Sequence, residues 1–213
     1  MVWKQHSNRE SFLENNVKDL CLNKNVLDFC CGTGMNGIDA LRWGASHVTF
    51  TDVRPKTFKD YILDEENSKI LNENNHVWKY ANADDIKSCY KKIDLDNIDI
   101  IIYHGHFYHA RNHRDIIKMF ADSSAEYIVF ETKGHLSEHA HIHWHIEDPN
   151  DIWNIAGDSD KELVGAPSSG ACWLFFDFYG FKVISNRSQI WGRHGQVQSE
   201  DMLTQIRTLY KRK

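Results

Sequence analysis

Two acidic residues flank a cysteine- and glycine-containing turn near the start of the chain. The segment 28–34 reads Asp-Phe-Cys-Cys-Gly-Thr-Gly, and Asp52 follows its last glycine after 18 residues. Each acid closes or interrupts a short apolar run, and the two glycines allow a tight turn into a helix because glycine has no Cβ and accepts a positive φ. The pattern predicts the first βαβ unit of a nucleotide-binding sheet. Asp52 would then accept hydrogen bonds from both hydroxyls of a ribose.

The inner acid, Asp28, decides between two kinds of nucleotide ligand. The dinucleotide fingerprint is G-x-G-x-x-G, and this chain has a Cys-Cys pair before Gly32 instead. A carboxylate inside the strand would repel a pyrophosphate but not a cationic ligand. A dehydrogenase is therefore the weakest hypothesis.

These residues resemble motif I of the class I S-adenosylmethionine (SAM)-dependent methyltransferases, Asp-x-Gly-x-Gly-x-Gly. The chain departs from the motif at Cys30, which takes the place of the first glycine and leaves less room beside a cofactor. The resemblance implies an α/β fold with a doubly wound, mostly parallel seven-stranded sheet, and SAM as cofactor. The first group of cofactor-binding residues that it implies is Asp28, Cys30, Gly32, Gly34, Asp52 and Val53.

Strands and helices are expected to alternate along the whole chain. We expect one domain, 1–213, with an irregular, substrate-facing insertion near 132–167, which is long for a connection. The strands are predicted near 26–30, 47–52, 76–80, 99–103, 127–130, 181–188 and 203–211. The helices are predicted near 7–22, 34–43, within 56–74, 84–91, 112–121 and from Pro167 to about 179. Ser168 is the expected N-cap of the last of these helices and Gly180 its C-terminal signal.

The stretch after the third strand should lie along the adenine edge of the cofactor. We expect the backbone of Ala83 and the side chain of Asp84 to contact the base, followed by Asn82. Asp85 is equally well explained as the cap of the next helix, and the sequence does not separate the two adjacent acids.

The fourth strand ends in 103–109, Tyr-His-Gly-His-Phe-Tyr-His. It lacks the Asn/Asp-Pro-Pro-Tyr/Phe motif of DNA amino-methyltransferases, and the chain lacks the Pro-Cys nucleophile of cytosine C5 enzymes. Its end is similar to the Leu-Tyr-His of a group that includes small-molecule methyltransferases and tRNA wobble-uridine carboxymethyltransferases. That similarity implies that His104 and Tyr108 lie against the cofactor.

Histidines near this strand end are candidate general bases, because the ordinary imidazole pKa of about 6.5 suits proton removal from an acceptor. His104 and His109 are placed best for this role, followed by His106 and His143. Methyl transfer from a sulfonium can require only alignment and exclusion of water, so a catalytic base is not obligatory.

Four histidines, at 139, 141, 143 and 145, alternate with other residues and would share one face of a strand. They could bind metal, line the acceptor pocket, or decorate a half-exposed hairpin with Ile142 and Trp144 facing the core. Same-face neighbours on a strand are about 7 Å apart, so at most two could share an ion, and no acid or thiol completes a tetrahedron. We expect no metal, with one or two of these histidines in the pocket.

Composition narrows the class of protein. The formal net charge is −5 without a long block of like charge, which disfavours nucleic acid as partner. The basic end, 207–213, is expected to be a solvated strand end. Five cysteines without a C-x-x-C pair indicate reduced thiols and a cytoplasmic protein. No membrane-length apolar run is present.

The sequence therefore predicts a SAM-dependent methyltransferase acting on an oxygen or nitrogen of a small-molecule acceptor beneath the insertion. Two alternatives stay open: a tRNA-modifying enzyme of the wobble-uridine type, which transfers a methyl or carboxymethyl group, and a non-catalytic SAM-binding scaffold subunit. Nothing in the sequence indicates the oligomeric state.

Overall fold

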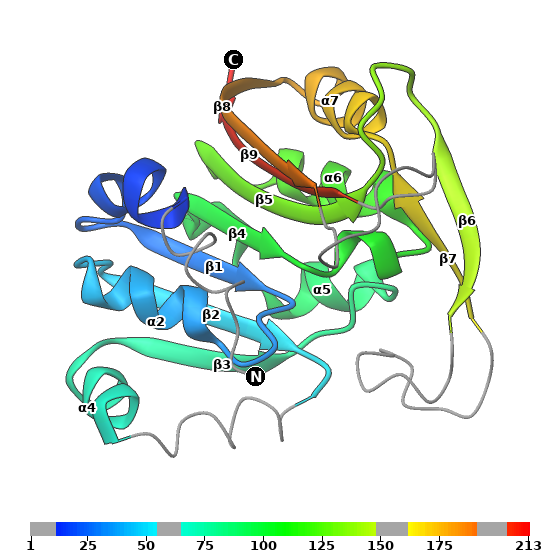
Figure 1. The fold of residues 1–213 in the computed structure, drawn as a ribbon. Helices are drawn as coiled ribbons and strands as arrows, with labels where there is room; N and C mark the ends of the chain where they lie inside the picture. The colour runs from blue at the N-terminus through cyan, green and yellow to red at the C-terminus, as the bar shows by residue number, and fades with distance from the viewer. Residues whose placement is uncertain (1–11, 55–64, 148–161, 191–203) are drawn as a thin grey trace.

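A computed structural model describes residues 12–54, 65–147, 162–190 and 204–213. Its centre is a seven-stranded sheet in the order β3-β2-β1-β4-β5-β9-β8 (Figure 1). The strand order reverses between β1 and β4, which creates the crevice at the strand ends where ligands of such folds bind. The predicted doubly wound, mostly parallel seven-stranded sheet is confirmed.

Four of the five parallel strands, β1, β2, β4 and β5, are largely buried along their apolar runs, whereas β3 is a half-buried edge strand. Their bounds are β1 (Asn25–Phe29), β2 (His47–Asp52), β3 (His76–Tyr80), β4 (Ile100–His104) and β5 (Tyr127–Gly134). The register aligns the carboxyl ends of neighbouring strands. Asp52 pairs with Tyr80, Phe29 with Tyr103, and His104 with Glu131. Functional side chains at these ends are therefore brought to one edge of the sheet.

The last two strands close the sheet in antiparallel pairing. β9 (Thr204–Arg212) lies between β5 and β8 (Phe181–Ile190), and the register of β8 shifts between Val183 and Ser185. The C-terminal end is not simply solvated as expected, because Arg207, Leu209 and Tyr210 are buried within β9.

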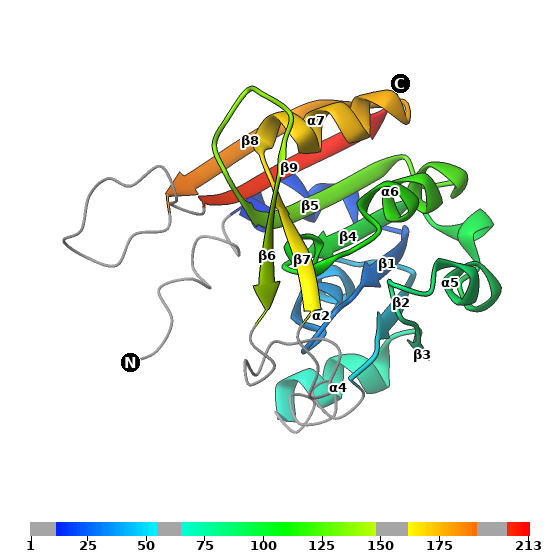
Figure 2. The same ribbon diagram turned by 90° about the vertical axis from the view of Figure 1, so that its right-hand side faces the viewer.

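Helices cover the two faces of the sheet and create two hydrophobic cores (Figure 2). One face carries the helical segment 12–16, η1 (Lys18–Leu20), α2 (Met35–Arg42) and α4 (Glu65–Glu73). The other carries α5 (Ile86–Lys92), η2 (Leu95–Asn97), α6 (His113–Asp122) and α7 (Ser169–Phe178). The alternation of strand and helix predicted from the sequence thus gives a three-layer α/β architecture.

The expected irregular insertion is partly regular. β5 continues to Gly134, four residues beyond its predicted end, and the segments β6 (Ile142–Glu147) and β7 (Glu162–Pro167) form an antiparallel two-stranded sheet. This hairpin is anchored to the main body by His113 of α6, whose Nε2 lies 2.9 Å from the carbonyl oxygen of Gly165.

Hydroxyl groups at the start of α7 hold the loop before the hairpin. Ser168 caps the helix, since its Oγ accepts from the N–H of Ala171, and the same Oγ donates to the carbonyl of His139. The predicted N-cap is confirmed, and Gly180 has the expected positive φ of 87° after the helix. The start of the predicted helix 7–22, the start of that within 56–74, and the middle of the insertion lie outside the described residues.

Candidate functional site

The turn after β1 has the left-handed backbone that the glycines predicted, and Cys30 shares it. Gly32 and Gly34 have φ values of 55° and 80°, and Cys30 has 56°. The N–H of Cys31 donates to the carbonyl of Thr51 at 2.8 Å, which joins the turn to the end of β2. A non-glycine residue in this conformation stores strain, and such strain is concentrated at functional sites.

The surroundings of the two cysteines of the turn favour the protonated thiols over the thiolates. Burial, followed by the charge of Asp52, raises the pKa of the Cys30 thiol well above its usual range. Burial and the charge of Asp28 do the same to the pKa of Cys31. Because the thiolate is the reactive form, both side chains remain inert thiols near neutral pH.

Asp28 is buried within β1 and fastens the helix that follows the turn. Its Oδ2 accepts a hydrogen bond of 2.9 Å from the N–H of Gly37 in α2. Gly37 is required there, because an added Cβ would lie 2.3 Å from Cε1 of Phe50. The inner acid therefore positions the backbone of the site.

Asp52 stands at the end of β2 with its carboxylate already engaged. Its Oδ2 accepts from the N–H of Gly32 at 2.8 Å, and its Oδ1 accepts from the N–H of Arg54 at 2.8 Å. The guanidinium of Arg54 adds a hydrogen bond of 3.2 Å to the same Oδ1. The acid expected to hold a ribose diol is thus covered by an arginine that sequence reasoning had missed.

A small hollow opens beside this acid at the carboxyl ends of the strands. Its volume is about 10 Å³, which is about enough to hold one water molecule. The lining residues come from the turn, from the end of β2, from the segment after β3 and from the segment after β4: Cys30, Asp52, Val53, Arg54, Ala81, Asn82, Ala83 and His106.

The histidine that lines the hollow is His106, held from behind by Tyr103. The Tyr103 hydroxyl lies 2.7 Å from Nδ1 of His106, and both side chains are buried. Burial, with the nearby His109 and Arg54, lowers the pKa of His106 to about 3. The imidazole is therefore neutral at physiological pH.

The segment after β3 separates the two adjacent acids. Asp85 is the N-cap of α5, because its Oδ1 accepts from the N–H of Ser88 at 3.1 Å. Asp84 is held by Arg111 at 3.1 Å, and its Oδ1 is buried without a hydrogen-bond partner among the described residues. Asn82 accepts from the N–H of Asp84, which shapes the loop.

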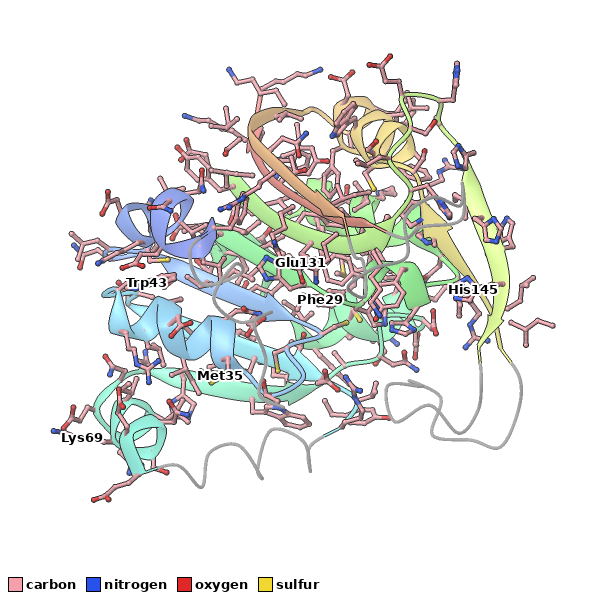
Figure 3. All side chains as sticks on the ribbon, viewed as in Figure 1. Phe29, Met35, Trp43, Lys69, Glu131 and His145 are labelled. Carbon is pink, nitrogen blue, oxygen red and sulfur yellow. The ribbon has the colours of Figure 1, made fainter. Side chains whose placement is uncertain are left out.

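The remaining predicted residues lie outside the hollow. His104 is buried at the end of β4 beside Glu131 of β5 in the register, and Figure 3 shows Glu131 in the body of the molecule. Tyr108 and His109 lie in η3 (Phe107–His109), with ring centroids 3.8 Å apart, and the Lys133 ammonium lies over the Tyr108 ring. A catalytic role for His104 or His109 stays a prediction.

The four alternating histidines do not share one strand. β6 begins at Ile142, so His139 and His141 precede it, and Figure 3 shows His145 on the hairpin at the edge of the molecule. The expectation that Trp144 faces the core is wrong, because 49% of it is exposed. Within the described ranges, no group of three or more histidine, cysteine, aspartate or glutamate side chains could hold a metal ion.

Fold comparisons give the same class of fold as the topology. The N-terminal domain of EvdMO1, solved with S-adenosylhomocysteine (SAH) bound, is 13% identical with a TM-score of 0.68, covering 100% of this chain and 83% of that one. A SAM-dependent methyltransferase from Mesorhizobium loti is 11% identical, with a TM-score of 0.64 and coverages of 95% and 96%. Magnesium protoporphyrin IX methyltransferase from Synechocystis, solved with SAH, is 12% identical with a TM-score of 0.59. The alignment covers 97% of this chain and 81% of that one. No curated protein matches the chain in sequence.

The sheet order and the glycine turn define a protein with the class I methyltransferase fold. The chain belongs to the family described as Conserved hypothetical protein 95, whose model matches residues 8–146. That match covers the first five strands of the sheet and most of the residues of the hollow. Among the described helices, none is long and apolar enough to cross a membrane.

Proposed function

We propose that this protein is a SAM-dependent methyltransferase that methylates an oxygen or nitrogen of a small-molecule acceptor. The observation that carries the proposal is the position of Asp52. It ends β2 beside the left-handed turn of Cys30 and Gly32, at the crevice where the strand order reverses. A carboxylate at this position is placed to accept hydrogen bonds from a ribose diol.

The residues around the hollow fit an adenosyl group. The turn presents backbone rather than bulky side chains, and Ala81 and Ala83 leave room for a flat base. Buried Oδ1 of Asp84, which has no partner in the described part of the chain, is an acceptor that suits an exocyclic amine. SAM would supply a methyl group on a sulfonium, which a nucleophile can displace directly.

The contribution of the protein to such a displacement is alignment and exclusion of water. The raised pKa of the Cys30 and Cys31 thiols disfavours either as a covalent nucleophile. The neutral imidazole of His106 adds no positive charge that would oppose a cationic cofactor. The residues of the site would therefore hold the cofactor beside the acceptor and exclude water, without adding a covalent group of their own.

The acceptor is proposed to bind between the strand ends and the β6–β7 hairpin. His113 fixes β7 to the main body beside η3, and Phe107 of η3 packs against the His113 ring at 4.6 Å. The hairpin is thereby anchored next to the segment that follows β4. The net charge of −5 favours a small molecule over RNA as the acceptor.

The scaffold alternative is favoured by one observation. In this structure Arg54 bonds to Asp52, and the adjoining hollow has room for only about one water molecule. A chain that no longer binds the cofactor would also keep Asp52 paired with Arg54. Binding measurements separate the two hypotheses, because an enzyme must open this site.

The decisive experiment is calorimetric titration of the purified chain with SAM and with SAH. We expect micromolar binding that is lost in Asp52→Ala and kept in Asp177→Ala, which removes an exposed acid of α7 far from the site. Binding that survives in Asp52→Ala would contradict the proposed ribose contact. No binding by the unmodified chain would favour the scaffold alternative.

A further inference from the structure

The pair formed by Tyr103 and His106 has a defined direction of hydrogen bonding. Tyr103 is fully buried in β4, and its hydroxyl has Nδ1 of His106 as its hydrogen-bond partner among the described residues. If Nδ1 carried the proton and donated to the hydroxyl oxygen, the O–H of Tyr103 would be a buried donor without an acceptor. Leaving a buried donor unsatisfied is costly, so the hydroxyl donates and Nδ1 accepts.

The tautomer of His106 follows from this direction. A neutral imidazole carries one proton, so when Nδ1 accepts a hydrogen bond the proton lies on Nε2. Neutrality is given by the burial of the ring among Tyr103, His109 and the segment after β4. His106 is therefore a neutral N–H donor that cannot turn into an acceptor without breaking its bond to Tyr103.

The residue that carries this donor lines the hollow beside Asp52. Nε2 of His106 makes no hydrogen bond within the described residues and is not among the enclosed polar atoms, and the residue lines the same hollow as Asp52 and Ala83. The segment after β3, where an adenine edge is expected, lines the same hollow through Ala81, Asn82 and Ala83. A fixed N–H donor there matches a ring nitrogen acceptor.

We propose that His106 is a specificity-determining residue that donates its Nε2 proton to a ring nitrogen of the adenine, with Tyr103 as the positioning residue that holds its tautomer. This inference rests on the proposed function and goes beyond it, because it assigns base recognition to a residue pair on β4. The donor selects a base by the acceptor it offers, so an analogue with C–H in place of that nitrogen should bind more weakly.

The test compares SAH with its 1-deaza, 3-deaza and 7-deaza analogues, each of which replaces one ring nitrogen by C–H. We expect the unmodified protein to bind one analogue about tenfold more weakly than SAH, as for the loss of a buried hydrogen bond. In His106→Leu this discrimination should disappear, because SAH itself loses the contact. In His106→Gln, whose amide N–H occupies a position similar to that of Nε2–H, it should return in part.

Tyr103→Phe and a control complete the design. Tyr103→Phe should weaken SAH binding and reduce the discrimination, since the imidazole can then adopt either tautomer. Phe178→Leu, at an exposed position of α7, should leave both unchanged. Circular dichroism of each variant verifies that it is folded.

The outcomes distinguish failure of the proposed function from failure of base recognition by His106. If SAH fails to bind the unmodified protein, the proposed function fails. If SAH binds but the discrimination among the deaza analogues is the same in His106→Leu as in the unmodified protein, base recognition by His106 is overturned while the proposed function stands. Equal affinity for all four ligands in the unmodified protein also overturns it.

Discussion

The guanidinium of Arg54 lies 3.2 Å from Oδ1 of Asp52, the oxygen that a ribose diol would share in the proposed cofactor complex. The carboxylate is almost completely buried, whereas the arginine side chain is 28% exposed. A ligand must therefore displace a flexible, partly solvated side chain, while the backbone bond from Gly32 to Oδ2 can remain. Binding and side-chain release are coupled at this position.

Removing Arg54 should strengthen cofactor binding. A partly exposed ion pair contributes about 0.5–1 kcal/mol, so Arg54→Ala should bind SAH roughly two- to fivefold more tightly by calorimetry. Arg42→Ala is the matched control, because Arg42 also pairs with a nearby acid, Asp39, and has a similar exposure of 29%. Weaker binding by Arg54→Ala would instead make this arginine a ligand contact.

Substitutions at Cys30 should reveal the strain in the turn. Because its φ is 56°, a β-branched residue there is disfavoured, and Cys30→Val should lower the free energy of unfolding by about 1–3 kcal/mol. Cys30→Gly should stay within about 1 kcal/mol of the unmodified protein, since relief of strain offsets lost packing. Urea unfolding of both variants measures the difference. Equal stability of the two would contradict the left-handed conformation.

The contact between α2 and β2 should be intolerant of a single methyl group. An alanine Cβ at Gly37 would lie 2.3 Å from Cε1 of Phe50, so Gly37→Ala should destabilise the protein by about 1–3 kcal/mol through overpacking. The double variant Gly37→Ala with Phe50→Leu should recover part of that loss. Thermal unfolding checks both, and no recovery would mean that the clash with Phe50 is not the cause.

Acid should destabilise the protein through His106. Its pKa is lowered from about 6.5 to about 3 in the folded state. The unfolded chain therefore binds a proton that the folded chain does not, and stability is full above pH 6.5 and is lost as pH falls toward 3. Between pH 7.5 and 5.5 the contribution of His106 falls by about 1.4 kcal/mol.

The pH effect is measured as the urea midpoint at both pH values in the unmodified protein and in His106→Gln. The variant should show the smaller change, although buried His113, whose pKa is also lowered, contributes to the loss in both proteins. An identical change in the two proteins would rule out His106 as the source.

The buried ion pair between β5 and β9 should be sensitive to the loss of one partner. Nε of Arg207 donates to Oε2 of Glu131 at 2.5 Å, and both side chains are at most 2% exposed. Glu131→Gln leaves a buried guanidinium without its counter-charge, so we expect a loss of about 3–5 kcal/mol.

Replacing both members of the pair tests whether the loss of stability comes from leaving one buried charge unpaired. Glu131→Leu combined with Arg207→Met removes both charges and should be less destabilised than Glu131→Gln. Chemical denaturation of the single and double variants measures the coupling between the two residues. If the double variant loses as much stability as the two single variants lose together, the two residues are not coupled and the expectation is contradicted.

Much of the fold was predictable because local patterns agree with it. The strands at 47–52 and 76–80 have the predicted ends, since each is an apolar or β-branched run bounded by turn residues. Ser168 and Gly180 marked the ends of α7 correctly for the same reason. A hairpin in the insertion was one of the alternatives that the sequence left open, but its strand bounds and the pairing of β6 with β7 were not predicted, because that pairing depends on contacts between separate segments.

The cofactor site was predictable in part. Asp52, Cys30 and the Asn82–Ala83 segment come together as the motifs indicated. Arg54 was missed as part of the site, although it follows Asp52 by two residues, and His106 was named only as a candidate base ranked after His104 and His109. Single charged or titratable residues carry no local signal of the direction in which they point.

The amino-acid sequence by itself determined the elements, the turn chemistry and the class of fold, because strand runs, glycines and capping residues act over a few neighbours. Only the tertiary structure decided which side chains share the crevice. In the folded chain Asp28 accepts a hydrogen bond from the backbone of Gly37, and Tyr103 is hydrogen-bonded to His106. Arg207 forms a buried ion pair with Glu131. These outcomes depend on register and packing between strands that are remote in the chain, which no local pattern specifies.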